Sequence, residues 1–174
     1  FRLESDVFTI QKGAADDGFN DLAVGAKWHM FEGGNGIPST SLLVHLGLPT
    51  GKDSLSGNEV EPSAKLLADF DLPYGFSLGT NIGADLPAGP QNTVRFLYAA
   101  ALAHDITGPQ GRFGAFVETA GAVPFQNDLP DEHQIDFGIT FLATPDIQLD
   151  LASQVGLNSD TPDLGIGAGF SIRL

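Results

Sequence analysis

Apolar residues alternate with polar or small ones along the C-terminal part of the chain, residues 133–174. From 135 to 143 the odd positions are apolar, whereas the even positions are mostly acidic, glycine or threonine. Successive side chains of a β-strand point to opposite faces, so this period of two predicts β-strands. Turn residues at 144–146 and 158–162 divide the segment into three strands.

The same alternation recurs upstream and predicts about ten strands joined by turns rich in glycine, proline or acidic residues. Each run is roughly nine to eleven residues long, the length that a tilted strand needs to cross a bilayer. The predicted strands are 2–12, 20–30, 41–48, 62–72, 76–86, 94–102, 113–123, 133–143, 147–157 and 164–174.

The less apolar face of these strands distinguishes two architectures. A soluble sandwich or barrel turns its apolar face inward and exposes a polar face to water. Here the second face is largely glycine and alanine with a few charges, which suits the inside of a narrow closed barrel. We therefore predict an all-β fold, an antiparallel up-and-down transmembrane β-barrel that forms a single domain over residues 1–174.

The connections between strands differ in length. Those at 73–75 and 144–146 are short, whereas those at 50–61, 124–132 and 158–163 are longer and acidic. Bacterial outer-membrane barrels combine short periplasmic turns with longer external loops, so this alternation favours the membrane barrel.

Composition excludes several other classes. The formal net charge is −14 with 8 Lys and Arg, which argues against nucleic acid as a partner. The chain has no cysteine, so a disulfide framework and a thiolate metal site are excluded. The first residues lack a signal-peptide pattern, and an exported protein would then be represented here by a mature or shortened form.

Charged and amide side chains on the predicted inner face are the candidate solute-contacting residues. Their first expected role is to pair with one another, because charges in a tight lumen must be paired; the alternative is a polar constriction that selects solutes. We expect Glu118 to be the principal residue, with Lys65 and Arg95 as its partners. The candidate lumen-lining residues are Lys27, His29, His45, Lys65, Asp69, Asn81, Arg95, Glu118, Asp136 and Asp150, with Asp21, Asp71, Asp85 and Arg173 as further inward acids and bases.

Two chemical alternatives are weaker. His29, His45 and Asp69 would supply three metal ligands, but inward histidines are more often hydrogen-bonded structure, so we expect no metal and no cofactor. Ser41, His45 and an acid would suggest a hydrolase, yet no G-x-S-x-G motif accompanies them, so we expect no enzyme.

Five short motifs occur in an order that resembles a known family. They read GFNDLAVGAK at 18–27, LGLPTG at 46–51, FSLGTNIG at 76–83, GAFVE at 114–118 and TPDIQLD at 144–150. The resemblance is to the outer-membrane transporter-like barrels named for the meta-cleavage pathway of phenol degradation. It implies a domain that can begin further upstream, with one additional N-terminal strand pair and 10 to 12 strands in all. Glu118 falls within one of the motifs.

The resemblance and the strand pattern together predict a barrel of the bacterial outer membrane that passes or binds small solutes, aromatic or hydrophobic ones among them. The expected partners are outer-membrane lipid, lipopolysaccharide and a small-molecule solute. A closed structural or interaction barrel and a soluble barrel with an apolar ligand inside are the alternatives.

Overall fold

Antiparallel β-strands make up almost all of the regular structure. The computed structural model describes residues 2–4, 8–9, 18–88, 93–107, 111–126 and 128–172, in which the helical element is the 3-10 turn η1 (Pro73–Gly75). No helix in these ranges has the length and hydropathy needed to cross a membrane. The strands are β1 (Arg2–Glu4), β2 (Phe8–Thr9), β3 (Gly18–Phe19), β4 (Leu22–Phe31), β5 (Ser39–Leu48), β6 (Glu61–Asp71), β7 (Phe76–Asp85), β8 (Arg95–Asp105), β9 (Phe113–Pro124), β10 (Glu132–Thr144), β11 (Ile147–Gly156) and β12 (Leu164–Ile172).

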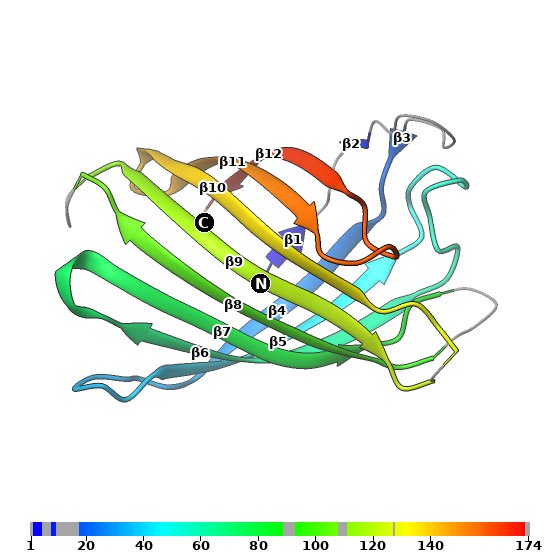
Figure 1. Cartoon of the computed structure of the whole chain (residues 1–174), viewed down its shortest axis with the longest axis horizontal. Helices are drawn as coiled ribbons and strands as arrows, with labels where there is room; N and C mark the ends of the chain where they lie inside the picture. The colour runs from blue at the N-terminus through cyan, green and yellow to red at the C-terminus, as the bar shows by residue number, and fades with distance from the viewer. Residues whose placement is uncertain are drawn as a thin grey trace.

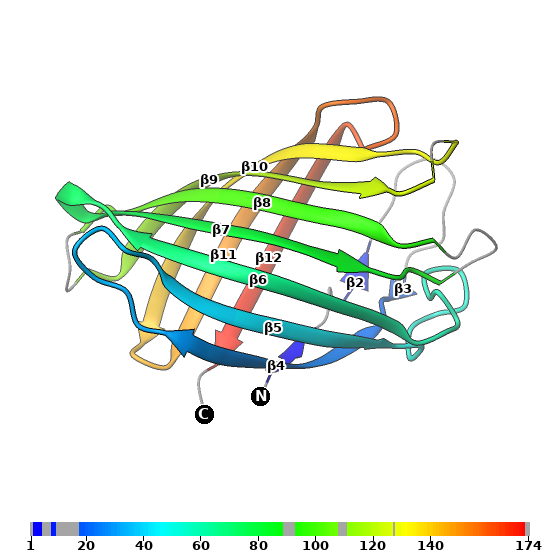
Figure 2. The same ribbon diagram turned by 90° about the horizontal axis from the view of Figure 1, so that it is seen from below.

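The strands form an up-and-down sheet. Ten of them pair in the order β1-β4-β5-β6-β7-β8-β9-β10-β11-β12, and every pair is antiparallel. Figures 1 and 2 show that the sheet curls strongly, so that its edge strands β1 and β12 come to lie on the same side. The predicted all-β, antiparallel up-and-down architecture is therefore confirmed.

The predicted first strand, 2–12, is found as two short strands in separate sheets. β1 pairs with β4 through Leu3 opposite Val24, and β2 pairs with β3 through Phe8 opposite Phe19. In both pairs the residue numbers of the two partners add to 27. β1 and β2 therefore pair in the same register with the segment that contains β3 and β4. The described residues of the predicted first strand are therefore in strands as expected, whereas residues 5–7 and 10–12 lie outside the described residues.

The other nine predicted strands are confirmed with ends that differ by at most three residues. β8 shows the largest difference, because it continues to Asp105 rather than stopping at 102. A register shift between Leu142 and Thr144 inserts Ala143 as an extra residue near the end of β10. Such a bulge bends a strand locally and interrupts its alternation, which is why the sequence pattern fades there.

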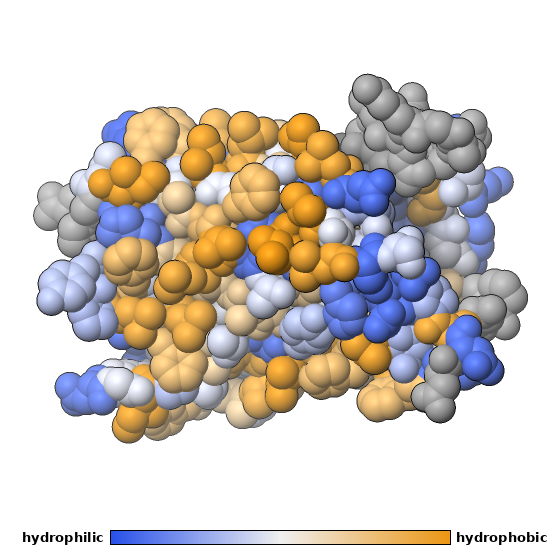
Figure 3. Space-filling view, in the orientation of Figure 1, coloured by the Kyte–Doolittle hydropathy of each residue, from blue (hydrophilic) through white to orange (hydrophobic). Residues whose placement is uncertain are grey.

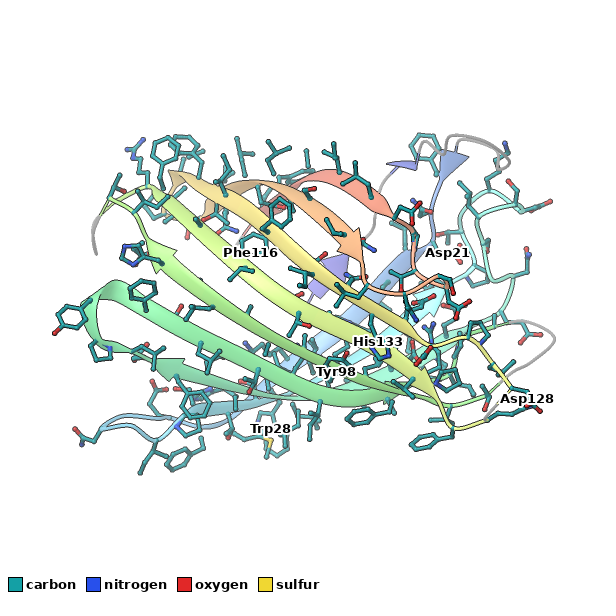
Figure 4. The ribbon with its side chains drawn as sticks, in the orientation of Figure 1. Asp21, Trp28, Tyr98, Phe116, Asp128 and His133 are labelled. Atoms are coloured by element: carbon teal, nitrogen blue, oxygen red, sulfur yellow. The ribbon has the colours of Figure 1, made fainter. Side chains whose placement is uncertain are left out.

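Large apolar side chains cover the outer, convex face of the sheet. Phe137 is 47% exposed, Leu151 51% and Ile166 76%, and Trp28 projects outward from β4 in Figure 4. In the space-filling view these residue types form a broad apolar surface, whereas hydrophilic side chains gather toward the end with the long loops (Figure 3). Among the described residues no side chain is fully buried, so the fold has no conventional hydrophobic core.

The inner face carries the small and charged residues. Glycines there allow neighbouring side chains to lie flat across the strands: a Cβ on Gly138 would lie 2.8 Å from the ring of Phe116, and one on Gly25 would overlap the ring of His45. The inner positions are therefore crowded in places although the face has few large residues.

Gly25→Ala tests this crowding. The new methyl group would meet the His45 ring and lie 2.7 Å from the Val44 carbonyl oxygen, so we expect a loss of about 1–3 kcal/mol in the free energy of unfolding. Gly167→Ala on β12 is the control, because no atom lies within 4 Å of the place that its new methyl group would take, and it should change stability by less than about 0.5 kcal/mol. Denaturant titration of both variants measures the difference, and equal stabilities would contradict the inner-face packing.

Candidate functional site

Arg95 forms the best-defined ion pair on the inner face. Its Nε and Nη2 atoms donate to the two carboxylate oxygens of Asp85 at 3.0 and 2.6 Å, and Nη1 lies 3.8 Å from Glu132. Arg95 and Asp85 are directly opposite each other in the β7–β8 register, so the bidentate geometry follows from strand pairing. The expected pairing of Arg95 with Glu118 was therefore wrong.

Lys27 and Asp69 make a second, looser contact. Lys27 Nζ on β4 lies 3.9 Å from Asp69 Oδ2 on β6, reaching across β5. Both side chains are about half exposed, at 40% and 54%, and water screens such a pair strongly. This contact orients two inner side chains without holding the sheet together.

A recess of about 210 Å³ lies on the inner face over β7, β8 and β9. Its small lining side chains are those of Ala99, Ala120 and Ala122 on β8 and β9. Lys65 of β6 packs over Gly83 of β7, where a Cβ would lie 2.8 Å from both its Cα and Cγ atoms. The recess is lined by Lys65, Asn81, Ala99, Glu118, Ala120 and Gln134, with Leu97, Tyr98, Gly121, Ala122 and Glu132 beside them.

Lys65 and Glu118 approach the recess from different strands without joining. Neither side chain forms an ion pair or hydrogen bond with another described residue. Glu118 lies directly opposite Asp136 in the β9–β10 register, and Asp136 accepts a hydrogen bond of 2.8 Å from Gln134 Nε2. Gln134 Oε1 in turn accepts a hydrogen bond of 2.8 Å from Gln154 Nε2. The side-chain amides of Gln134 and Gln154 thus hold Asp136 in place, whereas the Glu118 carboxylate remains available to a solute.

The three candidate metal ligands are held in different contacts. His29 Nε2 lies 2.9 Å from Glu32, His45 lies against Gly25, and Asp69 faces Lys27. Within the described ranges no group of three or more metal-ligating side chains forms. The structure thus does not bring the three side chains of this alternative together.

Two further candidates occupy separate positions. Asp150 lies on β11 opposite Thr140 and Gly169, away from the recess, whereas Arg173 falls outside the described residues.

A polar network that the strand pattern did not predict lies at the long-loop end of the outer face. Tyr98 Oη is 2.7 Å from His133 Nδ1, and His133 Nε2 is 2.9 Å from Asp131 Oδ2; Figure 4 shows the two rings side by side. Asn158 donates to the Asp131 carboxylate at 3.2 Å and Thr161 accepts from the backbone N–H of His133 at 2.9 Å. The hydrogen bond from His133 lowers the pKa of Asp131, although desolvation acts in the opposite direction. In the sequence, the signal for this network is the D-x-H spacing at 131–133, which places two polar residues on an otherwise apolar face.

The amino-acid sequence matches a known protein family over its whole length. The family described as "Putative MetA-pathway of phenol degradation" matches residues 1–174. The chain belongs to this family. The predicted resemblance to the family named for phenol degradation is confirmed, while no match to a curated protein was found.

Two motifs of this phenol-degradation family member meet at Asp21. Its Oδ1 accepts hydrogen bonds from the backbone N–H groups of Thr50 and Gly51 at 2.9 and 2.7 Å. Its Oδ2 accepts from Ser56 Oγ at 3.0 Å and from the Gly57 N–H at 3.2 Å. Asp21 therefore fastens the loop after β5 to the start of β4, and its prediction as an inward lumen residue was wrong.

These hydrogen bonds to Asp21, called the Asp21 clamp, make the stability of the fold depend on pH. Desolvation raises the pKa of Asp21, but the hydrogen bonds from Gly51, Ser56, Gly57 and Thr50 outweigh it and leave the pKa below its ordinary value of 3.8. A depressed pKa in the folded state contributes stability above the unfolded value, and this contribution is lost as pH falls through the folded value. We expect Asp21→Asn to lower the free energy of unfolding at pH 6 by about 1–3 kcal/mol and to change it much less at pH 2. Denaturant titration at both pH values measures this, and an equal loss at both would contradict the clamp.

Proposed function

We propose that the protein is a β-barrel of the bacterial outer membrane that binds or passes small solutes, with lipid and lipopolysaccharide around its outer face. The observation that carries the proposal is the exposed apolar outer surface combined with a small and charged inner surface. Contiguous exposed apolar surface on this scale is unfavourable in water, whereas hydrocarbon accommodates it. A soluble barrel with an apolar ligand inside would place the two surfaces the other way round.

Aromatic side chains near the strand ends support the same orientation. Phe113 and Phe141 lie 4.8 Å apart between ring centroids near the short-turn end. Phe96 and Tyr98 lie 6.4 Å apart toward the long-loop end. Membrane barrels carry such aromatic residues at both membrane–water interfaces.

The connections support an assignment of the two ends. Those at 72–75 and 145–146 occupy one end, whereas those at 49–60, 125–131 and 157–163 occupy the other. Because external loops of outer-membrane barrels are the longer ones, the acidic long-loop end is proposed to face outward from the cell.

Arginine scanning along one strand tests the lipid-facing surface. Leu151 lies near the middle of β11 and is 51% exposed, so Leu151→Arg should destabilise the protein in a bilayer by about 2–4 kcal/mol. Ile147→Arg lies on the same face at the strand end, where the expected loss is about 0–1 kcal/mol. Reversible folding into lipid vesicles measures both values, and a loss that does not depend on position along the strand would contradict a bilayer around this face.

Solute flux decides between passage and a closed barrel. Purified protein should make vesicles permeable to a small neutral solute, measured by light scattering during osmotic swelling. Vesicles that contain the protein but swell no faster than empty ones would leave the closed structural barrel as the function. Monodisperse behaviour without detergent would instead overturn the membrane location.

A further inference from the structure

We propose that the recess between Lys65 and Glu118 is a binding site for a neutral, single-ring solute that carries a hydroxyl group, and that it discriminates against the corresponding carboxylate. This deepens the proposed function and rests on it for the route by which a solute reaches the inner face. The site is formed by three features: a ring-sized volume, a floor of methyl groups, and a charged donor and a charged acceptor placed on different strands.

The size of the recess suits one ring. Its volume is about 210 Å³, and an apolar cavity of roughly 150 Å³ is known to hold benzene. Ala99 and Ala120 are directly opposite each other in the β8–β9 register, so their methyl groups lie side by side beneath the open space. A flat apolar ring placed on them would remove apolar surface from water.

The polar groups suit a hydroxyl. Lys65 supplies an ammonium donor and Glu118 a carboxylate acceptor, and a hydroxyl accepts one hydrogen bond and donates another. Strand pairing leaves both groups available. Lys65 lies opposite Leu43 and Gly83, and Glu118 opposite Ala101 and Asp136, so neither has an oppositely charged neighbour in the register.

The charge balance disfavours an anion. Two carboxylates, Glu118 and Glu132, line the recess with one ammonium, and Asp136 lies directly beside Glu118. Arg95 is shared between Asp85 and Glu132, so these three groups together still carry one negative charge and Arg95 does not offset Glu118. A carboxylate bound in the recess would place one of its oxygens toward the Glu118 carboxylate, and the two negative charges would repel each other.

Benzyl alcohol and benzoate form a ring-matched pair of probes. The full chain, in detergent micelles and with ¹³C-labelled alanine methyl groups, is titrated with each probe. Saturable shifts of the Ala120 and Ala122 methyl signals report binding at this site. We expect saturation with benzyl alcohol and at least tenfold weaker binding of benzoate.

Five variants, two of them controls, test the assignment. Ala99→Leu fills the recess and should weaken benzyl alcohol binding at least tenfold, whereas Ala100→Leu, the adjacent residue on the outer face, should leave it within about threefold. Lys65→Met removes the donor and should weaken binding about tenfold. Glu118→Gln should strengthen benzoate binding about tenfold, while Asp146→Asn, which removes a charge in the β10–β11 turn, should not.

The outcomes separate this site from the proposed function. Saturable, variant-sensitive binding without vesicle flux would support the site and count against passage. Flux without saturable methyl shifts, equal affinity for both probes, or equal effects of Ala99→Leu and Ala100→Leu would overturn the site. Circular dichroism checks folding of each variant, and Lys65→Met decides the question if Ala99→Leu does not fold.

Discussion

Backbone hydrogen bonding between neighbouring strands is the interaction on which the rest of this structure depends. Each long strand pairs only with the strands before and after it in the sheet, and no described side chain is fully buried. In a protein with a packed core, misplaced pairing is opposed by lost core contacts. Here the ladder itself must set the register, and a slip of one residue would exchange the apolar outer face for the charged inner one.

Small residues on the inner face follow from the curvature of this ladder. The strands curl, so inner side chains converge, and a long side chain has room only where its neighbour is small. Lys65 lies across Gly83, and Phe116 lies across Gly138. The alanine and glycine content of this face is thus the condition that lets a few long residues lie flat, and it leaves the recess between them.

Strand positions and face assignments could be predicted from the sequence because a period of two is a local property. The side-chain partners could not, because they depend on which residues the register places opposite each other. Arg95 pairs with Asp85 rather than Glu118 for this reason, and Asp21 binds a loop about thirty residues away through backbone groups that no pattern displays. The network around His133 joins β8, β10 and the loop after β11, so only the fold brings its members together.

Lys65 has no acidic partner opposite it because β6 and β7 approach each other closely at Gly83. An aspartate or glutamate at position 83 would sit opposite Lys65 and complete an ion pair like that of Arg95 and Asp85. A Cβ at that position, however, would overlap the Ala64 carbonyl oxygen and lie 2.8 Å from Lys65 Cα, so the backbone of β6 excludes any side chain there. The same geometry that requires glycine at 83 therefore keeps the ammonium of Lys65 available over the recess. Among the described lining acids the one without a partner is Glu118 on β9, which β7 and β8 separate from Lys65 on β6.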